Sequence, residues 1–433
     1  MAKSTFGAPM RELFLFDPQY KNLNHGSYGT YPRAVQAALR GFQDEAEART
    51  DTFIRYTTPP ALDASRTAVA KILNVPRREC VFVKNATTGV NTVLRNLRFS
   101  PGDVLLYFDT VYGAVEMGIT SLRETTENLL VRKVEYTFPV SHGQLVQQFR
   151  EVIDAVRRDG LNPRIALFDV IVSVPGVRFP FEALTGVCRE EGILSLIDGA
   201  HGIGHIPIDL GVLQPDFFTS NCHKWLFTPR GCAVLYVAQR NQHLIRTTLP
   251  TSWGFIPETS ETGASVPDGE NTPFEKLFEF VATTDDTAYM CVPAAVKFRE
   301  ELCGGEDQIT SYMESLAREG GDLVAAILGT EVLQETDLQP GEKSQLRRCA
   351  MANIRVPVDI EDIPDVPAAC AWLQKTLNDE YNTFVPFYPH GGALWFRVCA
   401  QVYLEKSDFQ WLGEVLKELV AKFKGKKVDL PLR

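Results

Sequence analysis

The strongest constraint on the fold is a regular alternation between short apolar runs and longer stretches with helical periodicity. The apolar runs are flanked by turn and polar residues, which is typical of buried strands. They cover residues 104–108, 165–168, 194–197 and 233–237. Between them, Val146–Arg158 and Phe181–Glu190 place apolar side chains at helical spacing. Strands that alternate with helices predict an α/β fold with a mostly parallel central sheet flanked by helices, and ligand chemistry at the carboxyl ends of its strands.

A change in composition marks the end of this pattern. Gly, Pro, Ser, Thr, Asp and Asn crowd the segment Trp253–Phe274, which predicts a long loop that serves as a lid, an interface element or a plain surface excursion. Beyond it, Tyr289–Leu302 and Trp411–Phe423 are predicted to be helices, and Arg355–Ile360 and Ala393–Val398 to be strands. We therefore expect an N-terminal arm (1–35), a large α/β domain (36–290) and a smaller C-terminal α+β domain (291–433).

Charge and cysteine usage exclude several classes of function. The chain has 44 basic and 54 acidic residues, and this net charge of −10 argues against a nucleic-acid surface or a polybasic membrane anchor. The N-terminus lacks the apolar core of a signal peptide, and no apolar run is long enough to span a membrane. The nine cysteines form no C-x-x-C pair, which favours free thiols over disulfides or a zinc site. We expect a cytoplasmic protein that binds a small molecule, with no metal, nucleic-acid or membrane partner.

An acid and a lysine follow two successive strand candidates. Asp198 comes directly after the run 194–197, and Lys224 lies just past the next apolar run. If these strands are parallel neighbours, their carboxyl ends bring the carboxylate and the amine to the same edge of the sheet. An aldehyde cofactor with a ring nitrogen needs such a pair, because the amine forms a Schiff base and the carboxylate keeps the ring nitrogen protonated. Either residue alone would more often be a solvated side chain, so the hypothesis depends on the pair.

A second motif combines a predicted strand, a turn and a helix start. The segment Val81–Asn91 runs from an apolar strand through Thr87, Thr88 and Gly89 into a helix expected to begin near Val90. Backbone N–H groups at a helix start, together with two hydroxyls, form a cradle suited to a phosphate. The chain has no P-loop and no complete G-x-G-x-x-G motif. The alternative for such a turn is a simple helix cap.

Taken together and in order, these motifs resemble a known family. They are Asn24-His25-Gly26-Ser27, Asn85–Asn91, Asp198–His201, and Asn221–Trp225 followed by Pro229–Gly231. The combination resembles the fold-type I, class V pyridoxal-phosphate enzymes. Within them it looks like the branch that holds isopenicillin N epimerase, the hercynylcysteine sulfoxide lyases of the ergothioneine pathway and the loline-type Mannich cyclases. The resemblance implies a fold-type I PLP-transferase fold, pyridoxal 5′-phosphate as cofactor and a small amino-acid-type substrate.

The resemblance also implies roles for individual residues. Lys224, Asp198 and Tyr112 would be catalytic: the Schiff-base lysine, the partner of the pyridine nitrogen and an aromatic stacked on the ring. The other expected cofactor contacts are His201 at the phenolic oxygen, and Thr87, Thr88, Asn221 and His223 at the phosphate.

Further matches concern the substrate and the assembly. Arg397 would hold the substrate carboxylate, although a buried ion pair is the alternative for an arginine in an apolar strand. Substrate contacts are also expected for Asn24, His25 and Tyr56, although for the last two a turn residue or core aromatic is an equal alternative. Thr284 resembles a threonine that reaches the phosphate of the neighbouring subunit, which implies a homodimer with shared active sites. Asp285 stands where the family usually has an arginine, so we expect that part of this contact to differ from the family's.

One departure from the family narrows the reaction. The ergothioneine lyases place an acidic cysteine beyond the stacking tyrosine, whereas this chain has none between Cys80 and Cys188 and carries Val134 or a neighbour there. An aliphatic side chain cannot protonate a sulfur leaving group. We therefore expect an enzyme that forms a Cα carbanion from an amino-acid-derived substrate and uses it for Mannich-type ring closure in alkaloid or secondary metabolism. A C–S lyase, an epimerase or a transaminase is the alternative, and a catalytically silent dimeric scaffold is the alternative outside enzymology.

Overall fold

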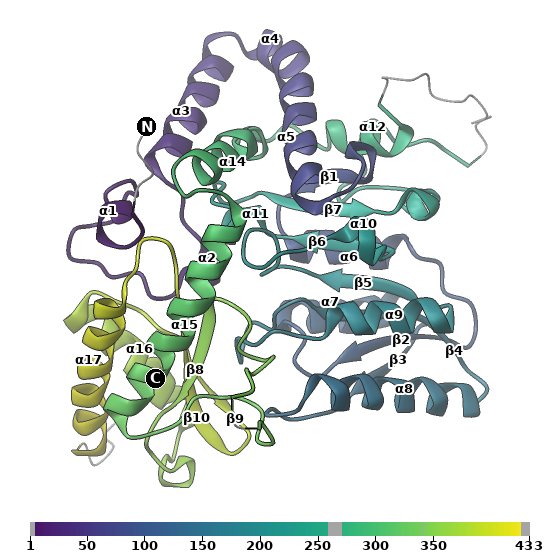
Figure 1. Cartoon of the computed structure of the whole chain (residues 1–433). Coiled ribbons are helices and arrows are strands. Elements are labelled where there is room, and N and C mark those ends of the chain that lie inside the picture. Colours follow the sequence, from purple (N-terminus) through teal and green to yellow (C-terminus); the bar gives the residue numbers. More distant parts are fainter. Residues whose placement is uncertain (1–4, 259–270, 340, 426–433) are drawn as a thin grey trace.

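A seven-stranded sheet forms the centre of the molecule (Figure 1). The computed structural model describes residues 5–258, 271–339 and 341–425. The strands follow the order β1-β7-β6-β5-β4-β2-β3, and the described pairs are parallel except those that β7 makes with β6 and β1. Their bounds are β1 (Cys80–Val83), β2 (Asp103–Phe108), β3 (Leu130–Val134), β4 (Asn162–Asp169), β5 (Leu194–Asp198), β6 (Phe217–Ser220) and β7 (Ala233–Val237). The prediction of a mostly parallel α/β sheet is therefore confirmed.

Both faces of this sheet are covered, which explains why its strands read as continuous apolar runs. Alternate residues of each strand belong to different hydrophobic clusters, as Leu105 and Leu106 of β2 illustrate. Helices α6 (Ala86–Asn96) and α7 (Gly113–Thr125) pack into the cluster of Leu105. Helices α8 (His142–Arg158) and α9 (Phe181–Glu191) pack into the cluster of Leu106.

A smaller antiparallel sheet lies in the C-terminal part of the chain (Figure 1). Its order is β8-β10-β9, and helices α15, α16 and α17 accompany it. The bounds are β8 (Met351–Arg355), β9 (Phe387–His390), β10 (Ala393–Cys399), α15 (Glu306–Leu328), α16 (Val366–Tyr381) and α17 (Lys406–Gly425). This agrees with the expected smaller α+β region, while the boundaries 1–35, 36–290 and 291–433 remain a prediction.

The N-terminal segment is hydrogen-bonded to the small sheet. The backbone N–H of Cys399 at the end of β10 donates to the carbonyl oxygen of Leu23 over 2.8 Å. The helices α3 to α5 then project from the body (Figure 1). The remaining elements are α1 (Ala8–Arg11), α2 (His25–Tyr28), α3 (Arg33–Ala48), α4 (Thr50–Thr52), a π-helical turn (Phe53–Thr57), α5 (Thr58–Leu73), α10 (Leu210–Leu213), α11 (Cys222–Trp225), α12 (Pro273–Glu279), α13 (Thr287–Met290), α14 (Val292–Glu301), and the 3₁₀ turns Arg77–Glu79, Gln239–Leu244 and Ile360–Asp362. None of the helices within the described residues is both long and apolar enough to cross a membrane.

Several predicted boundaries were wrong for identifiable reasons. The strand expected at Arg355–Ile360 ends at Arg355, and Pro357, which lacks an N–H, follows shortly after. The helix expected near Val90 begins at Ala86, because the Asn85 side chain accepts the Thr88 backbone N–H and caps it there.

Two further segments differ from expectation. The helix expected at 289–302 is split at Cys291 into α13 and α14, because Pro293 lacks the N–H that a continuous helix would need. Of the loop expected at Trp253–Phe274, residues 259–270 lie outside the described part. Its last two residues already belong to α12, which a capping box between Thr272 and Glu275 starts.

Candidate active site

Lys224 and Asp198 lie at the same edge of the central sheet. Strands β5 and β6 are parallel neighbours, with Asp198 opposite Thr219, and α11 carries Lys224 directly after β6. Burial and, after it, the positive charge of Arg397 lower the pKa of Lys224 to about 8, although the charge of Asp198 acts in the opposite direction. Lys224, Arg397 and Asp198 are therefore close enough for their charges to influence one another.

A second acid, which sequence reasoning did not single out, lies beside Asp198. Asp169 ends β4 opposite Asp198 in the parallel register. Burial raises the pKa of both carboxyls, and the charge of Asp198 adds to this for Asp169. The only sequence signal was that Asp169, like Asp198, directly follows a predicted strand. Because burial disfavours two charged carboxylates side by side, a cationic ring nitrogen placed against Asp198 would stabilise its ionised form.

His201 contacts the amine of Lys224. Its Nε2 lies 3.1 Å from Lys224 Nζ, and its Nδ1 accepts the indole N–H of Trp225 over 3.2 Å. Burial lowers the pKa of His201 well below its usual value, and the positive charge of Lys224 adds to this. His201 is therefore a neutral imidazole beside the lysine.

The residues expected at a phosphate gather around the start of α6. The Asn221 side-chain oxygen accepts the Ala86 N–H over 2.9 Å and so ties α6 to the end of β6. A Cβ at Gly89 would lie 2.3 Å from Thr219 Oγ1, so only glycine allows α6 to approach this strand. Thr87 and Thr88 occupy the first turn of the helix.

His223, which was also expected at the phosphate, is anchored by a different contact. Its Nδ1 contacts the carbonyl oxygen of Cys232 over 3.0 Å, and burial lowers its pKa to about 4. With Nδ1 held on the carbonyl, Nε2 is the ring nitrogen that could face an anion.

Arg397 is held in place by neutral acceptors. Its guanidinium donates to the Ser173 carbonyl oxygen (2.6 Å), Asn24 Oδ1 (2.8 Å) and Ser27 Oγ (3.0 Å), and the residue is 2% exposed. Among the described residues, no carboxylate lies within ion-pair distance of Arg397 and its buried Nε has no partner. The buried ion pair that was the alternative is thus not found there. An uncompensated buried guanidinium is suited to a substrate carboxylate.

His25 was expected to contact the substrate, but its ring contacts other residues of the chain. It is buried, its Nε2 contacts the backbone carbonyl oxygen of Lys224 (2.6 Å) and its Nδ1 contacts the Tyr403 hydroxyl (2.9 Å). Both ring nitrogens are therefore used within the chain, and burial lowers the pKa of His25 to about 3. We assign it to supporting α11, the short helix that carries Lys224.

The two tyrosines expected in the site are exposed. Tyr112 precedes α7 at the end of β2 and is 50% exposed, at the edge of the sheet where Lys224 lies. Tyr56 is 74% exposed and belongs to the π-helical turn of the projecting arm (Figure 1). Within one chain, the structure leaves Tyr56 away from the lysine.

Thr284 lies near the phosphate candidates without joining them. It lines the same cavity as Thr88, and its hydroxyl accepts from Lys84 Nζ (3.0 Å) and donates to Asp286 (2.9 Å). Asp285 accepts the Thr287 N–H and a Gln43 amide N–H, each over 2.9 Å. Burial acts to raise the pKa of Asp285, but these hydrogen bonds hold it below its usual value. Asp285 therefore stabilises the start of α13 and does not supply positive charge.

The donor set fits pyridoxal phosphate. A buried amine with a lowered pKa can condense with its aldehyde, and a pair of buried acids suits its pyridinium nitrogen. The start of α6 offers N–H groups and hydroxyls to its phosphate. All of these groups lie at the carboxyl ends of parallel strands, where α/β sheets bind ligands.

Comparisons with known proteins agree with this geometry. The model of the family described as Aminotransferase class-V matches residues 32–261. The "L-cysteine desulfhydrase-like protein lolT1" of Epichloe uncinata is 43% identical, over 95% of this chain and 95% of that protein. The hercynylcysteine sulfoxide lyase of Schizosaccharomyces pombe is 30% identical, over 96% of this chain and 98% of that protein.

Solved structures share the fold at lower identity. A mutant of C-DES with glycine covalently linked to its PLP cofactor aligns with a TM-score of 0.75 at 18% identity, over 94% of this chain and 99% of that one. A cysteine desulfurase from Thermococcus onnurineus aligns with a TM-score of 0.73 at 17% identity, over 98% of this chain and 100% of that one. The chain therefore belongs to the class-V aminotransferase family of pyridoxal-phosphate-dependent enzymes.

Proposed function

We propose that this enzyme closes a ring: it removes the α-proton of an amino-acid-derived substrate and joins that carbon to an electrophilic carbon of the same molecule, in a Mannich-type cyclisation of alkaloid or secondary metabolism. The observation that carries the proposal is the state of Lys224. With a pKa of about 8, this buried amine is neutral near neutral pH far more often than an exposed lysine is, and the neutral amine can accept a proton. The similarity to lolT1 and lolT2, at 43% and 42% identity, supports the loline-type branch.

The residues around Lys224 support a division of tasks. When bound, pyridoxal phosphate supplies an aldehyde that condenses with amines and a ring that accepts the electrons of a carbanion. Arg397 would bind the substrate carboxylate and so orient the Cα–H bond toward Lys224. Asp198 would keep a proton on the ring nitrogen. Tyr112 would stack on the exposed face of the cofactor ring and exclude water.

The absence of an acid at one position favours ring closure over elimination. Val134 or a neighbour stands where the lyases are expected to have a cysteine, and Val134 itself ends β3 and is completely buried. It offers no proton to a leaving group. A carbanion that is not discharged by elimination persists long enough to attack a carbon electrophile on the same substrate.

A C–S lyase is the second candidate, and Cys399 favours it. This fully buried thiol lies two positions after Arg397 on β10 and therefore on the same face of the strand. A thiol there could protonate a sulfur leaving group from a different side of the site. The identity of 30% to a hercynylcysteine sulfoxide lyase points the same way.

One experiment separates the candidates. The purified enzyme is incubated with candidate amino acids in D₂O, and NMR follows deuterium at Cα and the products. Ring closure predicts Cα exchange and a cyclic product of unchanged carbon count, whereas elimination predicts pyruvate and a thiol or sulfenate. Exchange with inversion alone would identify an epimerase. If Cys399→Ala abolishes pyruvate release but leaves Cα exchange intact, the lyase replaces the cyclase.

We further propose that the enzyme is a homodimer with shared active sites. Large aromatic side chains are exposed on the single chain, among them Tyr28, Tyr56 and Trp253. Exposed aromatics are enriched at protein interfaces. A partner subunit that brings Tyr56 to the other chain's lysine would explain why Tyr56 lies away from the lysine within one chain, and Thr284 would reach the phosphate bound by the neighbouring subunit.

A further inference from the structure

We propose that Trp225 fixes the tautomer of His201, so that His201 always presents an N–H toward Lys224 and toward the cofactor bound there. This inference rests on the proposed function only in that the cofactor binds at Lys224. It makes Trp225 a positioning residue that acts through His201.

The donor and acceptor chemistry of the two rings carries the argument. An indole N–H can only donate, so the nitrogen that it contacts must be an acceptor. That nitrogen is Nδ1 of His201, at 3.2 Å from Trp225 Nε1. In a neutral imidazole the single ring proton then resides on Nε2, which lies 3.1 Å from Lys224 Nζ. The hydrogen bond therefore runs from His201 to the lysine nitrogen.

A second histidine holds Trp225 in position by the same chemistry. The backbone N–H of Ala350 donates to His205 Nε2 over 2.8 Å, so the proton of this ring resides on Nδ1. Nδ1 donates in turn to the carbonyl oxygen of His201 over 2.8 Å. The His205 ring stacks on Trp225 with centroids 3.7 Å apart and planes at 20°. The direction of each hydrogen bond in this series, from Ala350 through His205 and His201 to Lys224, is thus determined.

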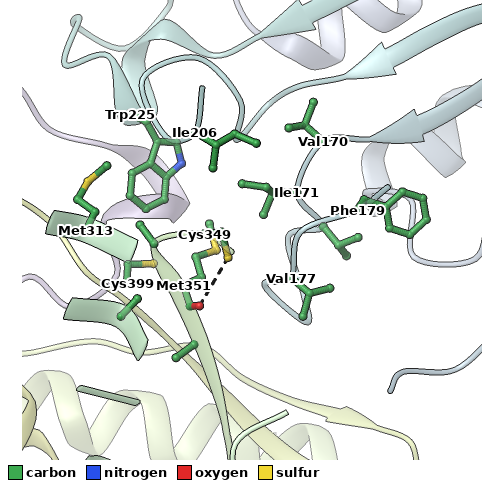
Figure 2. Close-up of a cluster of buried hydrophobic side chains, with 14 of the residues drawn as sticks. Val170, Ile171, Val177, Phe179, Ile206, Trp225, Met313, Cys349, Met351 and Cys399 are labelled. Carbon is green, nitrogen blue, oxygen red and sulfur yellow. Dashed lines mark hydrogen bonds between the residues drawn. The ribbon is translucent and has the colours of Figure 1, made fainter. Parts of the chain in front are cut away.

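Packing from both parts of the molecule prevents the indole from turning. Figure 2 shows Trp225 between Ile206 and side chains of the small sheet, including Met351 and Cys399. A Cβ at Gly26 would lie 3.1 Å from Trp225 Cζ2, so no space remains on that side. Arg299 donates to the Trp225 carbonyl oxygen over 2.7 Å and fixes its backbone.

The fixed tautomer has a consequence for the lysine. An N–H that points at Lys224 Nζ finds an acceptor in the neutral amine but meets another donor in the ammonium. The arrangement therefore favours the neutral amine, in the same direction as burial and Arg397. The other charged or titratable groups around His201 are Arg397, His205 and His223, and the acids that bear on Lys224 are Asp198 and Asp169.

The first test observes the tautomer directly. Full-length protein without cofactor, labelled with ¹⁵N-histidine, is studied by NMR, with His201→Gln to assign the signals. Wild type should show a protonated Nε2 and an unprotonated Nδ1 for His201. Trp225→Phe, which keeps an aromatic side chain but removes the indole N–H, should show a mixture or the other tautomer. A protonated Nδ1 in the wild type, or an unchanged tautomer in Trp225→Phe, would overturn the proposal.

The second test measures the lysine. Competitive acetylation of Lys224, read by mass spectrometry across pH, should be about tenfold slower at pH 7 in Trp225→Phe, the effect of a pKa rise of about one unit. Trp395→Phe is the matched control, since it removes a buried indole N–H that donates to the His390 carbonyl oxygen outside the site. Equal rates in wild type and Trp225→Phe would contradict the proposal. If Trp225→Phe does not fold, the tautomer of His201 in the wild type still tests the proposal. Neither readout uses substrate, so a wrong proposed reaction would leave both unchanged.

Discussion

The imidazole of His25 contacts the backbone carbonyl oxygen of Lys224, with 2.6 Å between Nε2 and the oxygen, although the two residues are 199 positions apart. Because a carbonyl can only accept, Nε2 carries the proton and Nδ1 accepts from the Tyr403 hydroxyl. The N-terminal segment and the C-terminal region thus hold α11, the short helix that carries the reactive amine.

His25→Phe is expected to lower the free energy of unfolding by about 1–3 kcal/mol, because it leaves a buried carbonyl without its donor. Urea unfolding of the cofactor-free protein measures this. Tyr403→Phe is the control, since it removes only the outer hydrogen bond and should cost less. An equal decrease in the free energy of unfolding in the two variants would indicate that the hydrogen bond to the Lys224 carbonyl oxygen does not stabilise the fold more than the outer one.

Lys224→Ala should fold but bind pyridoxal phosphate without a covalent bond. The wild type should be yellow and lose its colour on borohydride treatment with the cofactor fixed to Lys224, as mass spectrometry can verify. Burial of the ammonium is unfavourable, so the variant should unfold at the same or a higher urea concentration. A borohydride-fixed cofactor in Lys224→Ala would mean that another amine is the anchor.

Asp198→Asn should bind cofactor but lose Cα deuterium exchange by about hundredfold or more, because an amide does not keep a ring nitrogen protonated. Asp169→Asn is the matched variant on the neighbouring strand. It keeps Asp198 and should retain more of the exchange. Wild-type exchange in Asp198→Asn would remove this residue from its assigned role.

The buried acids also predict a pH dependence of stability. Burial raises the pKa of Asp169 in the folded state. The contribution of Asp169 to stability is therefore fully present below the pKa of an unfolded carboxyl, about 4, and is lost as the pH rises through the folded-state pKa. The cofactor-free wild type should therefore lose more stability between pH 4 and 7 than Asp169→Asn does. Urea unfolding at both pH values measures the difference. Parallel curves would contradict the raised pKa.

Arg397→Gln should weaken substrate binding and shift the pH profile. KM should rise by tenfold or more while the bound cofactor keeps its colour, since the guanidinium is assigned to the substrate carboxylate. Its positive charge also lowers the pKa of Lys224, so the midpoint of Lys224 acetylation should move above pH 8. A higher midpoint with unchanged KM would keep the electrostatic role and remove the substrate contact.

Much of this site follows from the sequence alone. Parallel strands end at the same edge of a sheet, so the position of Asp198 and Lys224 after successive strands was enough to predict their proximity. The motifs around Thr87 and Lys224 likewise predicted the family, and the alternation of apolar runs with helices predicted the fold. These are local patterns whose spatial result is fixed by strand direction.

Contacts between distant segments could be decided only by the tertiary structure. Asp169 became part of the site because β4 lies next to β5, and strand order is not written in any one strand. His25 and Trp225 acquired their partners because the N-terminal segment and the small sheet close over α11. A hydrogen bond between residues hundreds of positions apart depends on how whole elements pack, and the periodicity of the sequence carries no record of that packing.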